Sequence, residues 1–258
     1  MRINLRLTME SGQPPEFLWQ KTERGYARKI GGRTCEVWSE GDRLCFTPGF
    51  EREINKLFRA QDDLAAIEEA VATDRIMRLA FSRYRGLRIT ETNPWETMVC
   101  FICSINNNIP RIKRMVQGLM RDGCVLPPEE MARAHLAGLK LGFREKFLKQ
   151  AAKKAIGFDW DALRSADFDK AKRALMGFPG VGDKVADCIL LFGLGRLEAF
   201  PVDVWIRRAM RRYYGQRTIG QIHSFAKKKW GPLAGYAQQY LYCLARACLP
   251  SAKSEYIQ

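Results

Sequence analysis

Residues 173–188 read Arg-Ala-Leu-Met-Gly-Phe-Pro-Gly-Val-Gly-Asp-Lys-Val-Ala-Asp-Cys, and this stretch decides the fold. The pattern predicts one helix that ends near Gly177 and a second helix that starts near Asp183. Between them, Gly180 and Gly182 flank a small apolar residue and let the backbone approach a ligand closely. The amides that open the second helix would point outward, which suits a phosphate oxygen. A Gly-x-Gly alone also occurs in ordinary helix corners, but the full Phe-Pro-Gly-Val-Gly-x-Lys pattern indicates a helix-hairpin-helix element that holds a DNA backbone.

Lys184 lies in the first turn of the second predicted helix. The positive end of a helix disfavours a further positive charge, and partial burial acts the same way, so we expect some neutral amine that can attack carbon. The alternative is a lysine that only binds phosphate.

Asp203 helps to decide between these alternatives, because it precedes an apolar helical run and is expected to stay ionised there. Such a carboxylate could be a plain helix cap. It would also stabilise the positive charge that a sugar develops when its N-glycosidic bond breaks. Together, Lys184 and Asp203 predict a glycosylase that traps C1′ of the sugar as a Schiff base and then permits β-elimination of the 3′ phosphate.

The composition agrees with a DNA-binding protein. The 258 residues include 43 basic and 28 acidic side chains, a net charge of +15, and 47% are hydrophobic. This indicates a globular chain with a substantial core and a polyanionic partner. The N-terminus lacks the apolar segment of a signal peptide, and no apolar run approaches membrane-spanning length. Eight cysteines without secretory context indicate reduced thiols, and we expect Cys100 and Cys103 to be core residues.

The first fifty residues predict a small antiparallel sheet. Ile3, Leu5, Leu7 and Met9 alternate with polar residues, as on a strand. Further β-like runs, separated by Gly31-Gly32 and by Gly41-Asp42, cover residues 25–30, 33–39 and 42–47.

Helical patterns follow. Asn93-Pro94-Trp95-Glu96 combines a capping residue, a proline for the first turn and a glutamate three residues after the cap, so it predicts a helix start. The fold class is therefore α+β and mostly α, with a sheet domain and its flanking helices over residues 1–92 and a helical domain over 93–258. Before residue 93, helical spacing covers residues 52–60, 62–72 and 74–84.

These features resemble the helix-hairpin-helix DNA glycosylase superfamily, and most closely the eukaryotic type of 8-oxoguanine DNA glycosylase/AP lyase. The resemblance covers most of the chain, with motifs in matching order and spacing. The motifs are Ser11-Gly12-Gln13, residues 101–111 (Phe-Ile-Cys-Ser-Ile-Asn-Asn-Asn-Ile-Pro-Arg), Leu141-Gly142-Phe143-Arg144, residues 179–188, Pro201-Val202-Asp203-Val204 and Gly235-Tyr236-Ala237-Gln238.

The resemblance implies a role for each matching residue. Lys184 would be the nucleophile and Asp203 its catalytic partner. The Gly12 carbonyl would accept from N7–H of 8-oxoguanine, a position where guanine has only a lone pair. The other implied contacts are Cys188 and Tyr242 on the two faces of the flipped base, Gln238 on its pairing edge, Asn106, Arg111 and Arg144 at the unpaired cytosine, Phe143 as a wedge in the base stack, and Gly180 and Gly182 at the DNA backbone.

Two positions depart from the family pattern. Trp205 stands where a histidine is frequent, and Tyr242 stands where phenylalanine is usual. Only Cys243 and Cys248 lie where related enzymes carry a four-cysteine iron–sulfur loop, so we expect no cluster, no metal and no cofactor.

The expected partner is double-stranded DNA with an oxidised base, bound by a monomer in the cytoplasm at the nucleoid, or in the nucleus of a eukaryote. Glycosylases of other damaged bases and non-catalytic hairpin modules remain alternatives. Candidate phosphate contacts, which could equally be solvated helix faces, are Arg207, Arg208, Arg211, Arg212 and residues 227–229.

Overall fold

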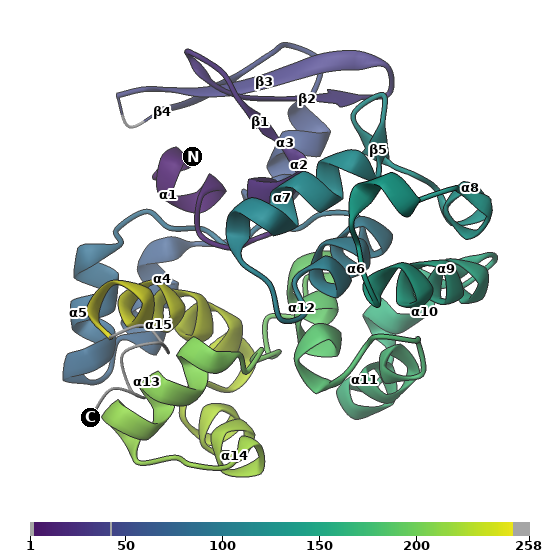
Figure 1. The fold of residues 1–258 in the computed structure, drawn as a ribbon. Helices are drawn as coiled ribbons and strands as arrows, with labels where there is room; N and C mark the ends of the chain where they lie inside the picture. The colour runs from purple at the N-terminus through teal and green to yellow at the C-terminus, as the bar shows by residue number, and fades with distance from the viewer. Residues whose placement is uncertain (1–2, 42, 250–258) are drawn as a thin grey trace.

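A computed structural model describes residues 3–41 and 43–249 of the protein (Figure 1). The N-terminal sheet is antiparallel, with strand order β1-β2-β3-β4. Gly31 and Gly32 both have positive φ, and Ile30 pairs with Arg33, so a two-residue turn joins β2 to β3 as the glycine pair predicts. The strands are β1 (Gln20–Lys21), β2 (Gly25–Ile30), β3 (Arg33–Glu40) and β4 (Arg43–Phe46).

The prediction of a strand at the N-terminus is wrong, because this segment forms helix α1 (Leu5–Met9). The Asn4 side chain caps the helix by accepting from the Leu7 amide at 3.0 Å. Leu5, Thr8 and Met9 are buried while Leu7 is only partly so, which is a helical spacing that the apolar alternation concealed. A short helix, α2 (Pro15–Leu18), follows.

Three helices lead from the sheet to residue 92, and two of them pack on the C-terminal part of the chain. They confirm the helical patterns predicted there, and Asp63 and Asp74 cap the second and third. In Figure 1, α4 and α5 lie beside α15, and the stacked rings of Phe81 and Tyr240, 3.7 Å apart, join α5 to α15. A domain division at residue 92 stays a prediction. The helices are α3 (Glu51–Leu57), α4 (Leu64–Val71) and α5 (Arg75–Arg83).

The helix start at Asn93 is confirmed, although the glutamate there has a different partner from the one expected. The Asn93 side chain accepts from the amides of Trp95 and Glu96. Glu96, however, accepts from the guanidinium of Arg28 on β2 and from the Val125 amide at 3.2 Å. A tertiary ion pair therefore replaces the capping box.

The remainder of the described chain is helical apart from a hairpin of β5 (Met120–Arg121) and β6 (Cys124–Val125), which the sequence analysis missed. Two 3₁₀ turns, Ala137–Leu139 and Gly231–Leu233, complete it. The helices are α6 (Pro94–Cys103), α7 (Ile109–Gly118), α8 (Pro128–Arg133), α9 (Arg144–Ala155), α10 (Trp160–Ser165), α11 (Phe168–Met176), α12 (Asp183–Leu194), α13 (Val204–Tyr214), α14 (Ile219–Trp230) and α15 (Ala234–Cys248).

Helix α12 is the centre of the helical region. Every residue from Val185 to Leu194 is buried, although a helix on the surface would expose one face. Helix α6 packs closely on α12, since a Cβ added at Gly193 would lie 2.8 Å from the Cα atom of Pro94, and α10 and α11 contact α12 as well. The N-terminal turn of α12 is the part of this helix that reaches the surface.

All eight cysteines are free thiols, and Cys100 and Cys103 are buried in α6 as predicted. Within the described ranges, no helix combines the length and the apolar character needed to cross a membrane.

Replacing Gly193 with alanine is expected to lower the free energy of unfolding by about 1–2 kcal/mol. Overpacking costs about 1–3 kcal/mol, and better helix propensity returns about 0.5–1 kcal/mol. Gly220 in α14 is the matched control, because a Cβ there meets nothing within 4 Å. Urea denaturation of both variants measures the difference. A Gly193→Ala variant as stable as Gly220→Ala would contradict the close packing of α12 on α6.

Candidate active site

The hairpin between α11 and α12 has the geometry that the sequence predicts. Its two glycines differ in whether the protein itself requires them. Gly180 has φ of +81°, and a Cβ there would lie 2.8 Å from Cβ of Phe147. Val181 is buried, so the tip is anchored in the core. Gly182 has extended backbone that any residue adopts, and a Cβ there would meet nothing within 4 Å. No contact inside the described protein requires glycine at position 182, and the backbone there is open to a ligand.

Lys184 lies in the first turn of α12, half-buried, as predicted. Its ammonium nitrogen donates to the Ser104 hydroxyl at 3.3 Å and lies 4.4 Å from the centre of the Phe101 ring. Both partners come from the end of α6 and the residue after it, so the close packing of α6 on α12 also positions the lysine side chain.

Asp203 caps α13, and its carboxylate accepts from the Ile206 amide at 2.8 Å. Burial raises the pKa of this carboxyl above its ordinary value, while the Ile206 amide and the positive charge of Lys184 lower it in part. The helix end thus fixes the orientation of a carboxylate that is otherwise costly to ionise.

Residues from five segments of the chain meet around one cavity of about 50 Å³. All six residues that were predicted to act in catalysis or to contact the damaged base line this cavity. This volume holds at most a few water molecules, since one water occupies about 30 Å³ of liquid. The lining residues are Gly12, Phe101, Lys184, Cys188, Phe192, Pro201, Asp203, Gln238, Gln239 and Tyr242.

Tyr242 lines this cavity close to Gly12. A Cβ added at Gly12 would lie 2.7 Å from the Tyr242 hydroxyl oxygen, so glycine at position 12 lets the ring approach. On the same wall, burial raises the pKa of the Cys188 thiol to about 12, although the charge of Lys184 opposes this. Cys188 is therefore a neutral, apolar surface of the cavity.

Two neighbouring glutamines on α15 form the floor. Gln238 donates from Nε2 to the Pro201 carbonyl at 3.2 Å, and its buried Oε1 has no hydrogen-bond partner among the described residues. Gln239, to which the sequence analysis gave no role, donates to the Ser11 carbonyl at 2.9 Å. The Gly12 amide in turn donates to Glu16 at 2.6 Å. The bond from Gln239 holds the Gly12 loop against α15, and the bond to Glu16 holds it against α2.

A cluster of charged side chains behind Lys184 also escaped the sequence analysis, because its members lie on three different helices. The Lys172 nitrogen lies 2.8 Å from Asp183 and 2.9 Å from Asp187. Nε2 of His223 lies 3.2 Å from Asp187 and 3.2 Å from the Phe200 carbonyl. Asp183, Asp187 and His223 have metal-binding chemistry, but the Lys172 ammonium already supplies the positive charge. The cluster joins the hairpin to the segment that leads to Asp203.

The residues predicted to contact the opposite base form a second group, from the loop after α6 to the first turn of α7 and at the start of α9. Arg144 is buried, and its guanidinium donates to the carbonyls of Ile105, Asn106 and Leu141. Its guanidinium carbon lies 4.5 Å from the centre of the Phe143 ring, which is 51% exposed. Arg144 therefore ties the loop after α6 to the loop before α9.

Asn106 and Arg111 complete this group. Asn106 is exposed and has φ of +46°, a left-handed conformation uncommon outside glycine. Arg111 is exposed and reaches the Lys140 carbonyl at 3.4 Å. Both polar side chains are thus accessible, Asn106 on the loop after α6 and Arg111 in the first turn of α7.

Comparison with known proteins agrees with this geometry. The family model described as 8-oxoguanine DNA glycosylase, N-terminal domain, matches residues 1–98. The N-glycosylase/DNA lyase OGG1 of Arabidopsis thaliana is 30% identical over 294 aligned positions, which cover 98% of this chain and 79% of that protein. The solved structure of MBOgg1 in complex with a low-affinity DNA ligand is 33% identical, with a TM-score of 0.85 over 95% of this chain and 92% of the other.

The 8-oxoguanine glycosylase/lyase of Clostridium acetobutylicum, solved with double-stranded DNA containing cytosine opposite 8-oxoguanine, has a TM-score of 0.80. It is 27% identical, over 90% of this chain and 88% of that one. The sheet, the hairpin helices and these similarities lead to one conclusion: the chain belongs to the 8-oxoguanine DNA glycosylase family of helix-hairpin-helix proteins.

Proposed function

We propose that this protein is a base-excision repair enzyme that removes 8-oxoguanine from duplex DNA and nicks the strand at the resulting site. The observation that carries the proposal is the cavity in which Lys184 and Asp203 meet Gly12, Cys188, Gln238 and Tyr242. A hairpin that only binds DNA has no use for a buried carboxylate and a lysine on one cavity. The similarity to named N-glycosylase/DNA lyases supports the same activity.

In the proposed reaction the neutral amine of Lys184 attacks C1′ of the flipped nucleotide, and the base departs with the electron pair of the glycosidic bond. The carboxylate of Asp203 stabilises the positive charge that the sugar develops. Loss of a proton from nitrogen and opening of the sugar ring leave a Schiff base. Removal of a 2′ proton then expels the 3′ phosphate, which is β-elimination.

Recognition of the base would require Tyr242 to turn away from Gly12, because the present cavity is too small for a purine. The ring could then stack on one face of the base, with Cys188 on the other. The unpartnered Oε1 of Gln238 would accept from the pairing edge of a guanine-type base, which relieves the cost of a buried acceptor without a donor. The Gly12 carbonyl would accept from N7–H, which guanine lacks.

The DNA would be held by the Gly182 amide region of the hairpin and by the loops of Asn106 and Phe143. We propose a monomer that acts wherever the cell keeps its DNA, with Arg111 and Arg144 at the cytosine left unpaired. The proposed reaction requires no metal ion and no cofactor.

A panel of duplexes that each carry one lesion tests the substrate. The expected result is excision and nicking of 8-oxoguanine opposite cytosine, with far slower reaction on alkylated purines and oxidised pyrimidines. Faster excision of another base would assign the enzyme to that lesion. Binding to every duplex without base release would indicate a non-catalytic hairpin module.

Replacing Lys184 with glutamine is expected to abolish the covalent complex that borohydride traps with lesion DNA, because the amide cannot form a Schiff base. The measurement is trapping followed by gel electrophoresis. Lys154→Gln serves as a control, since Lys154 donates to the Gly177 carbonyl on the flank of the hairpin. Trapping of Lys184→Gln at the normal rate would identify a different nucleophile.

Replacing Asp203 with asparagine is expected to slow excision by about 10²–10³-fold while keeping the protein stable. Asparagine caps helices as well as aspartate does, so α13 keeps its cap. Because burial raises the pKa of Asp203, ionising it costs stability above that pKa, and stability falls as pH rises through the interval between its unfolded and folded values.

The Asp203→Asn variant should therefore be at least as stable as the parent at pH 7 in urea denaturation. In the parent, single-turnover excision should fall on the acid side at a higher pH than an ordinary aspartate allows. An unchanged excision rate in the variant would remove Asp203 from the mechanism.

Replacing Gly182 with alanine is expected to weaken DNA binding at least tenfold and to lower the free energy of unfolding by at most about 1 kcal/mol, the loss of a favoured cap residue. The added methyl group meets no protein atom but stands where a phosphate would approach. Fluorescence anisotropy with lesion DNA measures the affinity. Unchanged affinity would show that the backbone of DNA does not approach this turn closely.

A further inference from the structure

A surface pocket of about 380 Å³ opens along α13, outside the cavity described above. Its lining consists of Val204 and four arginines, and among the described residues no carboxylate lines it. The arginines are Arg207, Arg208, Arg211 and Arg217.

The helix itself produces this pocket. Val204, Arg207 and Arg211 recur at helical spacing on one face, while Ile206 and Met210 are buried on the other. Gly215, with φ of +69°, ends the helix and lets Arg217 return toward the same face. The apolar face of α13 therefore fixes the direction in which its arginines point.

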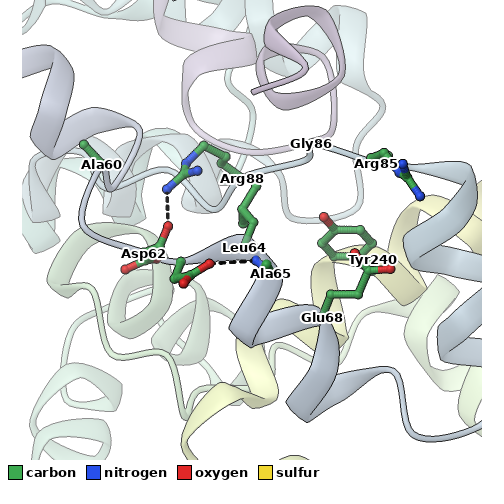
Figure 2. A pocket seen from close by; sticks show the side chains of 10 residues that line it. Ala60, Asp62, Leu64, Ala65, Glu68, Arg85, Gly86, Arg88 and Tyr240 are labelled. Atoms are coloured by element: carbon green, nitrogen blue, oxygen red, sulfur yellow. Dashed lines mark hydrogen bonds between the residues drawn. The ribbon is translucent and has the colours of Figure 1, made fainter. Parts of the chain in front are cut away.

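Some other arginines of the protein have acidic side chains beside them. Arg59 pairs with Asp62 at 2.7 Å and with Glu91 at 3.1 Å. In the pocket of Figure 2, of about 440 Å³, Arg85 and Arg88 share the lining with Asp62, Asp63 and Glu68, and Arg88 donates to the Asp62 carbonyl at 2.7 Å.

The pocket on α13 differs in this respect. Within the part of the chain that the structure describes, Arg207, Arg211 and Arg217 form no ion pair, and all three are exposed. Positive charges that converge without a counter-charge repel one another and attract a polyanion. The free protein leaves this charge for a ligand to neutralise.

The pocket lies on the helix that follows Asp203. α13 begins directly after Asp203, so the pocket and the cavity share one helix. With a rise of about 1.5 Å per residue, Arg207 lies about 6 Å and Arg211 about 12 Å along the helix from Asp203. Successive nucleotides of one B-DNA strand rise about 3.4 Å along its axis, so 12 Å spans three to four of them.

We propose that this arginine pocket binds phosphates of the lesion-bearing strand, one to four nucleotides from the flipped nucleotide. The proposal rests on the proposed function, which places the flipped sugar between Lys184 and Asp203. The hairpin would hold the strand at one place and the arginine pocket at a second, so that the sugar between them is presented to the cavity.

The salt dependence of binding tests the proposal. The probe is a duplex with a stable tetrahydrofuran abasic analogue, which requires no excision. Each phosphate contact contributes about 0.9 to the slope of log affinity against log salt, so the double variant Arg207→Gln/Arg211→Gln should reduce the slope by about 1.8. Arg52→Gln/Arg133→Gln removes the same charge from exposed positions on α3 and α8 and should leave the slope nearly unchanged. Equal slopes for the two double variants would overturn the proposal.

A scan with methylphosphonates, which neutralise one phosphate at a time, locates the contacts. The parent protein should lose affinity at one or more positions within four nucleotides of the analogue on the same strand, and Arg207→Gln/Arg211→Gln should lose little more there. Equal losses for parent and variant, or sensitivity confined to the opposite strand, would overturn the proposal. Because binding is measured without base release, a parent that fails to excise 8-oxoguanine would contradict the proposed function and leave this result interpretable.

Discussion

The close packing of α12 against α6 is the constraint on which the candidate site depends. Gly193 allows the two helices to meet, and every residue from Val185 onward is buried. A helix held in this way cannot rotate or slide without opening the core, so its first turn is a rigid platform. Lys184 stands on that turn, and the end of α6 supplies its partners, Phe101 and Ser104.

Polar interactions around this first turn connect α11, α12 and α14 with the segment that leads to Asp203. Asp187 is buried on α12 and pairs with Lys172 on α11 and His223 on α14. His223 also reaches the Phe200 carbonyl, just before Asp203. Removing one member of such a buried network leaves the others without compensation, so the network favours one arrangement of hairpin, lysine and aspartate.

Many turns and helix caps of this structure could be predicted from the sequence, because they depend on residues close together in the chain. Gly31-Gly32, Asn93 and Asp203 act through hydrogen bonds and backbone conformations within a few residues, and the structure has a turn or a cap at each. The prediction of an N-terminal strand was wrong for the complementary reason. The apolar pattern is compatible with both a strand and a helix, and the cap by Asn4 together with burial against the core favours the helix. Glu96 was placed correctly in its helix, but its partner Arg28 lies on a strand far away in the sequence.

The sequence by itself determined the hairpin, the first-turn position of Lys184, the cap at Asp203 and the family, because each depends on residue types at short, ordered spacings. Only the tertiary structure decided that Gly12 contacts Tyr242, that Gln239 holds the Ser11 carbonyl, and that Arg144 is buried on backbone carbonyls. It also decided that Arg207, Arg211 and Arg217 line one pocket, which no carboxylate of the described residues lines. These are contacts between residues distant in the chain or on separate elements. Their distances follow from how helices pack, and no local pattern encodes that packing.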